Sequence, residues 1–209
     1  IASLVALAVA GDDESTPRGA TAVERLLRPY ATPDGPMATL GGLADVLNAV
    51  AVERPGVGVA LVLGHGGRSA ALDAWRDHAA AVHRAVDTAH TGRYDGVYVV
   101  RADVRADARS EDIEDDNGGD EGATLGRLRT VARLVRDFRS PEPLVAALDD
   151  GLAALSAPES GADDAAAALA SEFPTESAAW SGGPRRAIAR FDPATDEADV
   201  IAAIREASK

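Results

Sequence analysis

The sequence predicts an α/β fold in which a mostly helical part precedes a mixed β-sheet flanked by helices. Apolar residues recur at helical spacing through residues 70–89, and β-forming residues fill the stretch GVYVVRAD at 96–103. Asp150-Gly151, a pair typical of hairpin turns, stands between two matched apolar halves. We expect residues 1–90 to form the helical part and residues 91–209 to form the sheet part.

The composition indicates a globular chain without cysteine chemistry. Its 209 residues are 46% hydrophobic, and no window approaches the roughly 18 unbroken apolar residues of a membrane span. The lack of cysteine excludes disulfides, thiolate metal sites and cysteine nucleophiles. Acidic residues number 34 against 21 basic ones, and Lys209 is the one lysine. We therefore expect a cytoplasmic protein adapted to molar salt and without membrane contact, in which local basic clusters say more about partners than the net charge of -13.

Helices are predicted through most of the first 90 residues. They are expected at 1–10, 21–30 and 40–51, and the apolar opening run is interpreted as a core helix that the sequence enters midway, not as a signal peptide. The run VGVALVLG at 57–64 is predicted as a buried strand, closed by HGGRS as a strand-to-helix turn. In the helix at 70–89, Asp77 and His78 are assigned to the polar side, and the apolar face is expected at Leu72, Trp75, Ala79, Val82 and Val86.

The second part begins with a predicted turn at 91–96 and the strand that follows it. The acidic stretch at 106–122 is expected to be a solvated loop. It does not fit a calcium loop, because the sixth residue counted from Asp112 is Asn117 instead of Gly and the twelfth is Ala123 instead of Glu. The next element is predicted as a helix at 124–139 with Leu128, Val131, Val135 and Phe138 on its apolar face.

A hairpin with strands at 144–148 and 152–156 is preferred over the continuous helix that alanine and leucine propensity favours. A helix at 162–173 and a strand at 187–191 follow. The last predicted helix starts at Glu197 and directs Val200, Ile201 and Ile204 toward the core.

Arg129, Arg133 and Arg136 fall on one face of the helix at 124–139, because they are spaced i, i+4, i+7. One interpretation is a solvated helix flank. The other is a stripe that faces the phosphates of a nucleic acid. Spacing alone leaves both open.

The stretch SGGPRRAIARF at 181–191 is a second basic candidate. Gly182 and Gly183 are expected to form a turn that takes positive φ and brings backbone N–H groups to an anion. Arg185 and Arg186 then begin a strand, so only one of them faces the same side as the site. We choose Arg186, because Ile188 should point inward on its side. The alternative is that both arginines merely offset neighbouring acids.

The order of these pieces resembles the C-terminal half of archaeal RecJ-like proteins of the DHH phosphoesterase family, particularly those of salt-loving archaea. The likeness lies in LADVLNAVAVERPGVGVALVLG at 43–64, YDGVYVVR at 94–101, SAPES at 156–160 and the Gly-Gly turn before the last strand. It implies the helical end of a DHH domain and its connection at 1–90, then a DHHA1-like nucleic-acid-binding domain at 91–209. Pro184 stands where such domains carry histidine in a G-G-G-H turn, and Ser156 stands without the arginine that follows the corresponding serine.

The resemblance implies a metal-dependent, single-strand-specific exonuclease of which this chain supplies substrate grip. The site residues would be Gly182, Gly183, Arg185, Arg186, Arg129, Arg133, Arg136 and Ser156. No D-H-H triplet is present, and the four histidines do not pair with carboxylates at ligand spacing, so we assign this chain no catalytic residue and no metal ligand. Manganese or magnesium is expected in the longer parent protein. Two alternatives remain open, namely a non-catalytic replication scaffold that binds the GINS complex and a small-molecule or cyclic-dinucleotide phosphoesterase.

Overall fold

The computed structural model describes residues 2–12, 17–27, 29–105, 119–175 and 180–208. The chain divides into two compact units, Ile1–Ala79 (unit 1) and Ala80–Lys209 (unit 2), and the boundary falls within helix α5 (Arg68–Thr88). Among the described helices, none is both long and apolar enough to cross a membrane.

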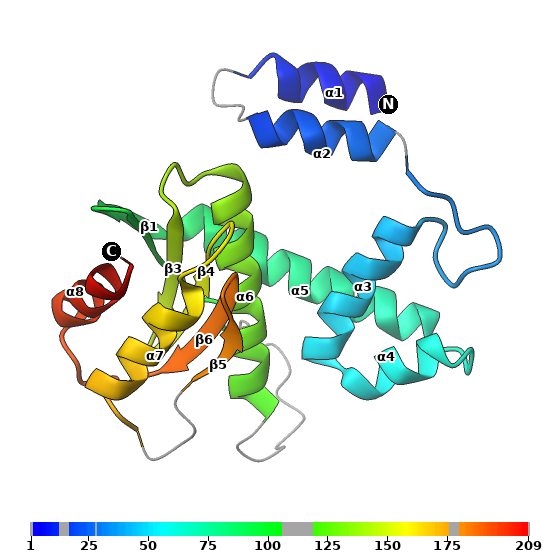
Figure 1. Cartoon of the computed structure of the whole chain (residues 1–209). Helices are drawn as coiled ribbons and strands as arrows, with labels where there is room; N and C mark the ends of the chain where they lie inside the picture. The colour runs from blue at the N-terminus through cyan, green and yellow to red at the C-terminus, as the bar shows by residue number, and fades with distance from the viewer. Residues whose placement is uncertain (1, 13–16, 28, 106–118, 176–179, 209) are drawn as a thin grey trace. The chain divides into compact units, whose positions relative to one another are not determined.

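Unit 1 is helical, as predicted (Figure 1). It contains α1 (Ala2–Ala10), α2 (Pro17–Leu27), α3 (Leu40–Glu53), α4 (Pro55–Val62) and the first part of α5. Helix α3 begins where the Thr39 side chain accepts a hydrogen bond from Gly42 N at 3.1 Å, which satisfies one of the unpaired amides of the first turn. A small apolar core joins α3, α4 and α5 through Met37, Val46, Val50, Leu61, Ala71 and Ala74.

The buried strand predicted at 57–64 is wrong, because these residues belong to helix α4. Pro55 occupies the first turn, where its fixed φ suits a helix and its missing N–H costs nothing. Leu61 is buried against the α3 side of the core, whereas Val59 and Val62 remain exposed. A short apolar run fits either a strand or a helix, and here the HGGRS turn connects two helices.

The face that α5 buries agrees with the predicted one only in part, because Val82 is buried as expected and Leu72, Ala79 and Val86 are half-buried. Trp75 is 37% exposed, whereas Ala71, Ala74 and His78 are buried. His78 was assigned to the polar side, yet its Nδ1 lies 2.9 Å from Glu53 Oε1 and both side chains are nearly buried. Alanine is small enough to let neighbouring helices approach closely, so Ala71 and Ala74, which the prediction did not include, face the core of unit 1.

Unit 2 is a six-stranded mixed sheet covered by helices on both faces, which confirms the α/β class (Figure 1). The strand order is β1 (His90–Tyr94), β2 (Val97–Arg101), β3 (Leu144–Asp149), β4 (Leu152–Ser156), β6 (Arg186–Arg190), β5 (Trp180–Gly183), and only β2 and β3 run parallel. Helix α6 (Gly119–Phe138) packs on one face, and α7 (Ala162–Glu172) and α8 (Glu197–Ala207) pack on the other.

The predicted β3–β4 hairpin is confirmed, with Asp149 opposite Leu152 and Val145 opposite Ser156. Asp150 and Gly151 have φ of 34° and 76°, the double positive φ of a tight hairpin turn. Helix propensity does not prevail, because the sheet lies between two helical layers and both faces of the hairpin are buried. Likewise α8 directs Val200, Ile201 and Ile204 into the core, as predicted.

Three further predictions in unit 2 need correction. The turn expected at 91–96 is mostly strand β1, and only Asp95-Gly96 forms the turn. The acidic loop expected at 106–122 ends earlier, because α6 begins at Gly119, and residues 106–118 lie outside the described residues. Phe138 at the end of α6 is 38% exposed, whereas Leu128, Val131 and Val135 are buried as predicted.

Candidate nucleic-acid interface

Four of the predicted arginines converge on the α6 side of the sheet. Arg129, Arg133 and Arg136 project from α6, and Arg186 begins β6. Partial burial lowers the pKa of Arg186 below its ordinary value, and the positive charges of Arg133, Arg136 and Arg129 lower it further. We call these four residues the arginine cluster.

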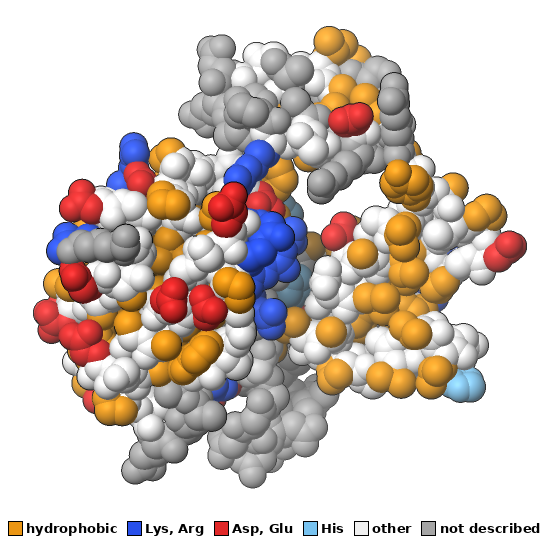
Figure 2. Space-filling model, viewed as in Figure 1, with side chains coloured by type: hydrophobic (Ala, Val, Ile, Leu, Met, Phe, Trp, Pro, Cys, Tyr) orange, Lys and Arg blue, Asp and Glu red, His pale blue; other side chains and the backbone are white. Residues whose placement is uncertain are grey.

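The alternation of side chains along β6 explains why Arg186 joins this cluster. Ile188 packs into the core on the α6 side, and Arg186, two residues earlier, therefore faces the same way. Arg186 thus lies on the side of Ile188, as the alternation predicts, and its role as the anion contact stays a prediction. Figure 2 shows Lys and Arg side chains gathered over the region of unit 2 where α6 and the β5–β6 hairpin lie.

Most of the cluster lacks neutralising partners. Within the described residues, Arg129, Arg133 and Arg186 form no hydrogen bond or ion pair. Other arginines of unit 2 are paired, for example Arg190 with Glu121 and Arg93 with Glu142. In a chain of net charge -13, three neighbouring guanidinium groups that form no ion pair among the described residues are a candidate site for an anion. The Asp137 carboxylate is the opposite charge that acts on Arg186.

Arg136 is placed differently from the other three. It is buried, and its Nη1 donates to the carbonyl oxygen of Ala157 at 2.8 Å. Its Nε and Nη2 donate to the Asp137 carboxylate. The predicted stripe of three equivalent arginines therefore consists of two outward side chains and one that is bound to the protein.

Ser156 lies directly opposite Arg186 in the β4–β6 pairing. It is 1% exposed, and its Oγ has no hydrogen-bond partner among the described residues. A buried hydroxyl without a partner costs free energy unless a ligand supplies one. The Ser156 hydroxyl is therefore a hydrogen-bond donor without a partner among the described residues, buried next to Arg186 of the arginine cluster.

The glycines of SGGPRR do not form the turn that the sequence predicts. Both lie in strand β5, and the turn consists of Pro184 and Arg185. Gly182 has φ of 134°, and a Cβ there would lie 2.5 Å from Ala187 Cα, so close contact with β6 requires glycine. Gly183 has no positive φ and open space around it. Arg185 is exposed in the turn.

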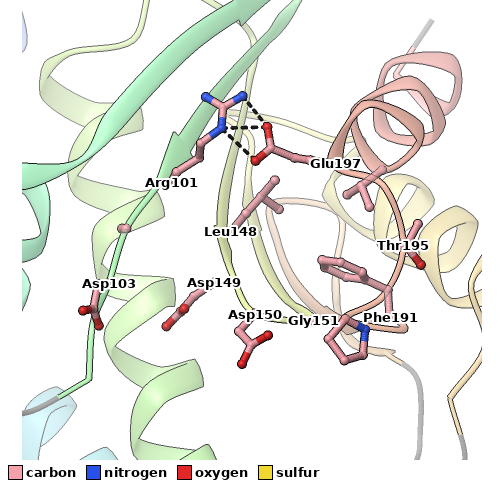
Figure 3. A pocket seen from close by; sticks show the side chains of 12 residues that line it. Arg101, Asp103, Leu148, Asp149, Asp150, Gly151, Phe191, Thr195 and Glu197 are labelled. Atoms are coloured by element: carbon pink, nitrogen blue, oxygen red, sulfur yellow. Dashed lines mark hydrogen bonds and ion pairs between the residues drawn. The ribbon is translucent and has the colours of Figure 1, made fainter.

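A polar pocket of about 360 Å³ lies at the ends of β2 and β3, and sequence analysis did not identify it (Figure 3). The hydrogen bond to the Glu197 carboxylate raises the pKa of Arg101 above its ordinary value, and Tyr94 contributes a further hydrogen bond. Arg105, which lines a neighbouring pocket, is similarly paired with Asp150. Ligands often bind where parallel strands end, but the guanidinium groups here are already neutralised, which makes the arginine cluster the stronger anion site.

Among the described residues, no three histidine, aspartate or glutamate side chains converge as metal ligands would.

Comparisons with known proteins place the sheet unit in a family. Residues 89–206 match a family model described as "Uncharacterized protein rrnAC1427, C-terminal domain". The chain is also 44% identical over 189 residues to "Uncharacterized protein rrnAC1427" of Haloarcula marismortui. That alignment covers 90% of this chain and 44% of the relative, so the chain spans less than half of the relative's length.

Proposed function

We propose that this chain, which belongs to the rrnAC1427 C-terminal domain family, holds a single strand of nucleic acid by its phosphate groups at the arginine cluster. The observation that carries the proposal is the convergence of Arg133, Arg129 and Arg186 without hydrogen bonds or ion pairs among the described residues of an acidic chain. Self-repulsion within such a cluster is relieved when a polyanion binds, and the release of counterions from the polyanion adds to the affinity.

The chemistry of the cluster suits phosphodiesters. A guanidinium group donates two parallel hydrogen bonds to phosphate oxygens, and two such groups from separate elements can hold successive phosphates. The Ser156 hydroxyl is buried beside Arg186, and a bound phosphate would reach this further donor only by displacing the atoms that cover it. Contacts to phosphate groups bind the sugar-phosphate backbone of the strand and do not distinguish one base sequence from another.

We further propose that the parent protein is a RecJ-like exonuclease of the DHH family, in which this chain grips the substrate. The hydrolytic residues and the manganese or magnesium ions would then belong to parts of the parent outside this chain. Incubation of the full-length parent with labelled single strands, with and without manganese, tests this step. Shortened products support the exonuclease. Binding without hydrolysis favours a scaffold such as a GINS partner, and hydrolysis of dinucleotides alone favours a small-molecule phosphoesterase.

Binding by the chain itself is tested by fluorescence anisotropy with a labelled oligothymidylate across a KCl series. Arg133→Ala and Arg186→Ala should each weaken binding and lower the slope of log affinity against log salt by about 0.7, the value for one lost phosphate contact on a single strand. Arg185→Ala is the matched control, because it removes the same charge from the neighbouring position. Absence of wild-type binding, or equal effects of all three variants, would refute the proposed site.

A further inference from the structure

Arg136 connects three segments that are distant in the sequence. From the last turns of α6 it donates to the carbonyl oxygen of Ala157, the first residue after β4. Ala157 N in turn donates to the carbonyl oxygen of Arg185 at 3.0 Å, and Ala162 N donates to that of Pro184 at 2.9 Å. The end of α6, the β4–α7 loop and the β5–β6 turn are thus joined through one guanidinium group and two backbone hydrogen bonds.

The charge of Arg136 is already used within the protein. Its side chain is 9% exposed, and Asp137, at 26%, accepts hydrogen bonds from both Nε and Nη2. A phosphate could recruit this guanidinium only by displacing the carboxylate and the Ala157 carbonyl. Arg133 and Arg186 need no such exchange.

We infer that Arg136 and Asp137 form a positioning pair that sets the geometry of the phosphate site, and that Arg136 does not contact the strand; this inference rests on the proposed function. Ser156 immediately precedes Ala157, and Arg186 immediately follows Arg185, so the hydrogen-bonded segments flank both donors of the site. The pair holds the β4–α7 loop against the end of α6, and the two backbone hydrogen bonds hold the β5–β6 turn against that loop.

The test uses the full chain with Arg136→Lys and Asp137→Ala, and Arg133→Lys as the matched control. Lysine keeps the positive charge but loses the planar fork that reaches two acceptors at once. Arg136→Lys should weaken oligothymidylate binding roughly tenfold, the effect of one lost hydrogen bond to a charged group, with an unchanged salt slope. Hydrogen exchange at the Ala157 and Ala162 amides should accelerate. In Arg133→Lys, exchange at these amides should stay as in wild type.

Asp137→Ala distinguishes most clearly between Arg136 as a residue that positions the loop and Arg136 as a phosphate ligand. Removal of a carboxylate from an anion site ordinarily strengthens binding of a polyanion. If Arg136 positions the loop, Asp137→Ala instead weakens binding and accelerates exchange at the Ala157 and Ala162 amides. Tighter binding by Asp137→Ala, or a lower salt slope in Arg136→Lys, would overturn the inference and make Arg136 a phosphate ligand. If the wild-type chain does not bind the oligonucleotide, the proposed function itself fails.

Discussion

Replacement of Gly182 by alanine should destabilise unit 2 far more than the same change at Gly183. The two glycines are adjacent in β5, and the sequence alone gives no reason to expect different effects at the two positions. Gly182 has φ of 134°, and a Cβ there would lie 2.5 Å from Ala187 Cα, 3.0 Å from Ala187 Cβ and closer still to the carbonyl oxygen of Arg186. At Gly183 an added Cβ meets nothing within 4 Å.

The magnitude follows from two costs at Gly182. A non-glycine residue held at a φ that side chains rarely adopt costs about 1–3 kcal/mol. Overpacking against atoms that cannot move aside costs about 1–3 kcal/mol more, and these atoms belong to the backbone of β6. We therefore expect Gly182→Ala to lower the free energy of unfolding by about 3 kcal/mol, and Gly183→Ala to stay within about 1 kcal/mol of wild type.

Differential scanning calorimetry of the full chain at constant KCl measures this difference. For a unit of this size, a loss of about 3 kcal/mol lowers the midpoint by roughly 10 °C. The midpoint of Gly183→Ala should remain near that of wild type. If the two variants melt at the same temperature, the reasoning that only Gly182 is required for contact with β6 is wrong.

Three further changes have defined outcomes. Ser156→Ala should raise the free energy of unfolding by about 1 kcal/mol, because it removes a buried hydroxyl without a partner, and it should weaken oligonucleotide binding. Calorimetry measures the stability and anisotropy measures the binding. A lower stability of the variant would contradict the first expectation. Glu53→Ala and His78→Ala should each lower the stability of unit 1 by about 1–3 kcal/mol, and the double variant should lose less stability than the sum of the two single losses. Urea unfolding measures these losses, and additive losses would show that the two side chains are not coupled. Burial raises the pKa of Asp149 above its ordinary value of 3.8, so the protonated form favours folding and this contribution is lost as pH rises through the folded-state pKa. Asp149→Asn should therefore be more stable than wild type at neutral pH, and the difference in stability should vanish below pH 3.8. Urea unfolding at neutral pH and below pH 3.8 measures this difference. A less stable variant at neutral pH would show that the attraction to Arg105 outweighs the cost of burial.

Period-2 and turn patterns predicted the parts of unit 2 on which the site depends. Asp150-Gly151 identified the β3–β4 hairpin against helix propensity, because positive φ at both positions is a strong local constraint. Alternation along β6 placed Arg186 on the face of Ile188. Helical spacing brought Arg129 and Arg133 to one side of α6. These features depend on near neighbours in the sequence, so the sequence specifies them.

The features that sequence analysis missed depend on distant contacts. Strand β1 is polar and exposed at the sheet edge, so it has no apolar alternation to reveal it. The burial of His78 follows from Glu53, 25 residues away. The requirement for glycine at 182 comes from the partner strand, and the hydrogen bond of Arg136 goes to a carbonyl 21 residues away. None of these partners is visible in a local pattern.

The Pro184-Arg185 turn is held to the β4–α7 loop by its own carbonyl groups, and its side chains take no part in those two hydrogen bonds. The turn therefore tolerates a change of side chain at Arg185 without loss of its position. Because the chain contains no cysteine, Arg185→Cys would introduce its single thiol beside the arginine cluster. A dye attached there would report occupancy of the site by fluorescence without altering the residues proposed to hold the strand.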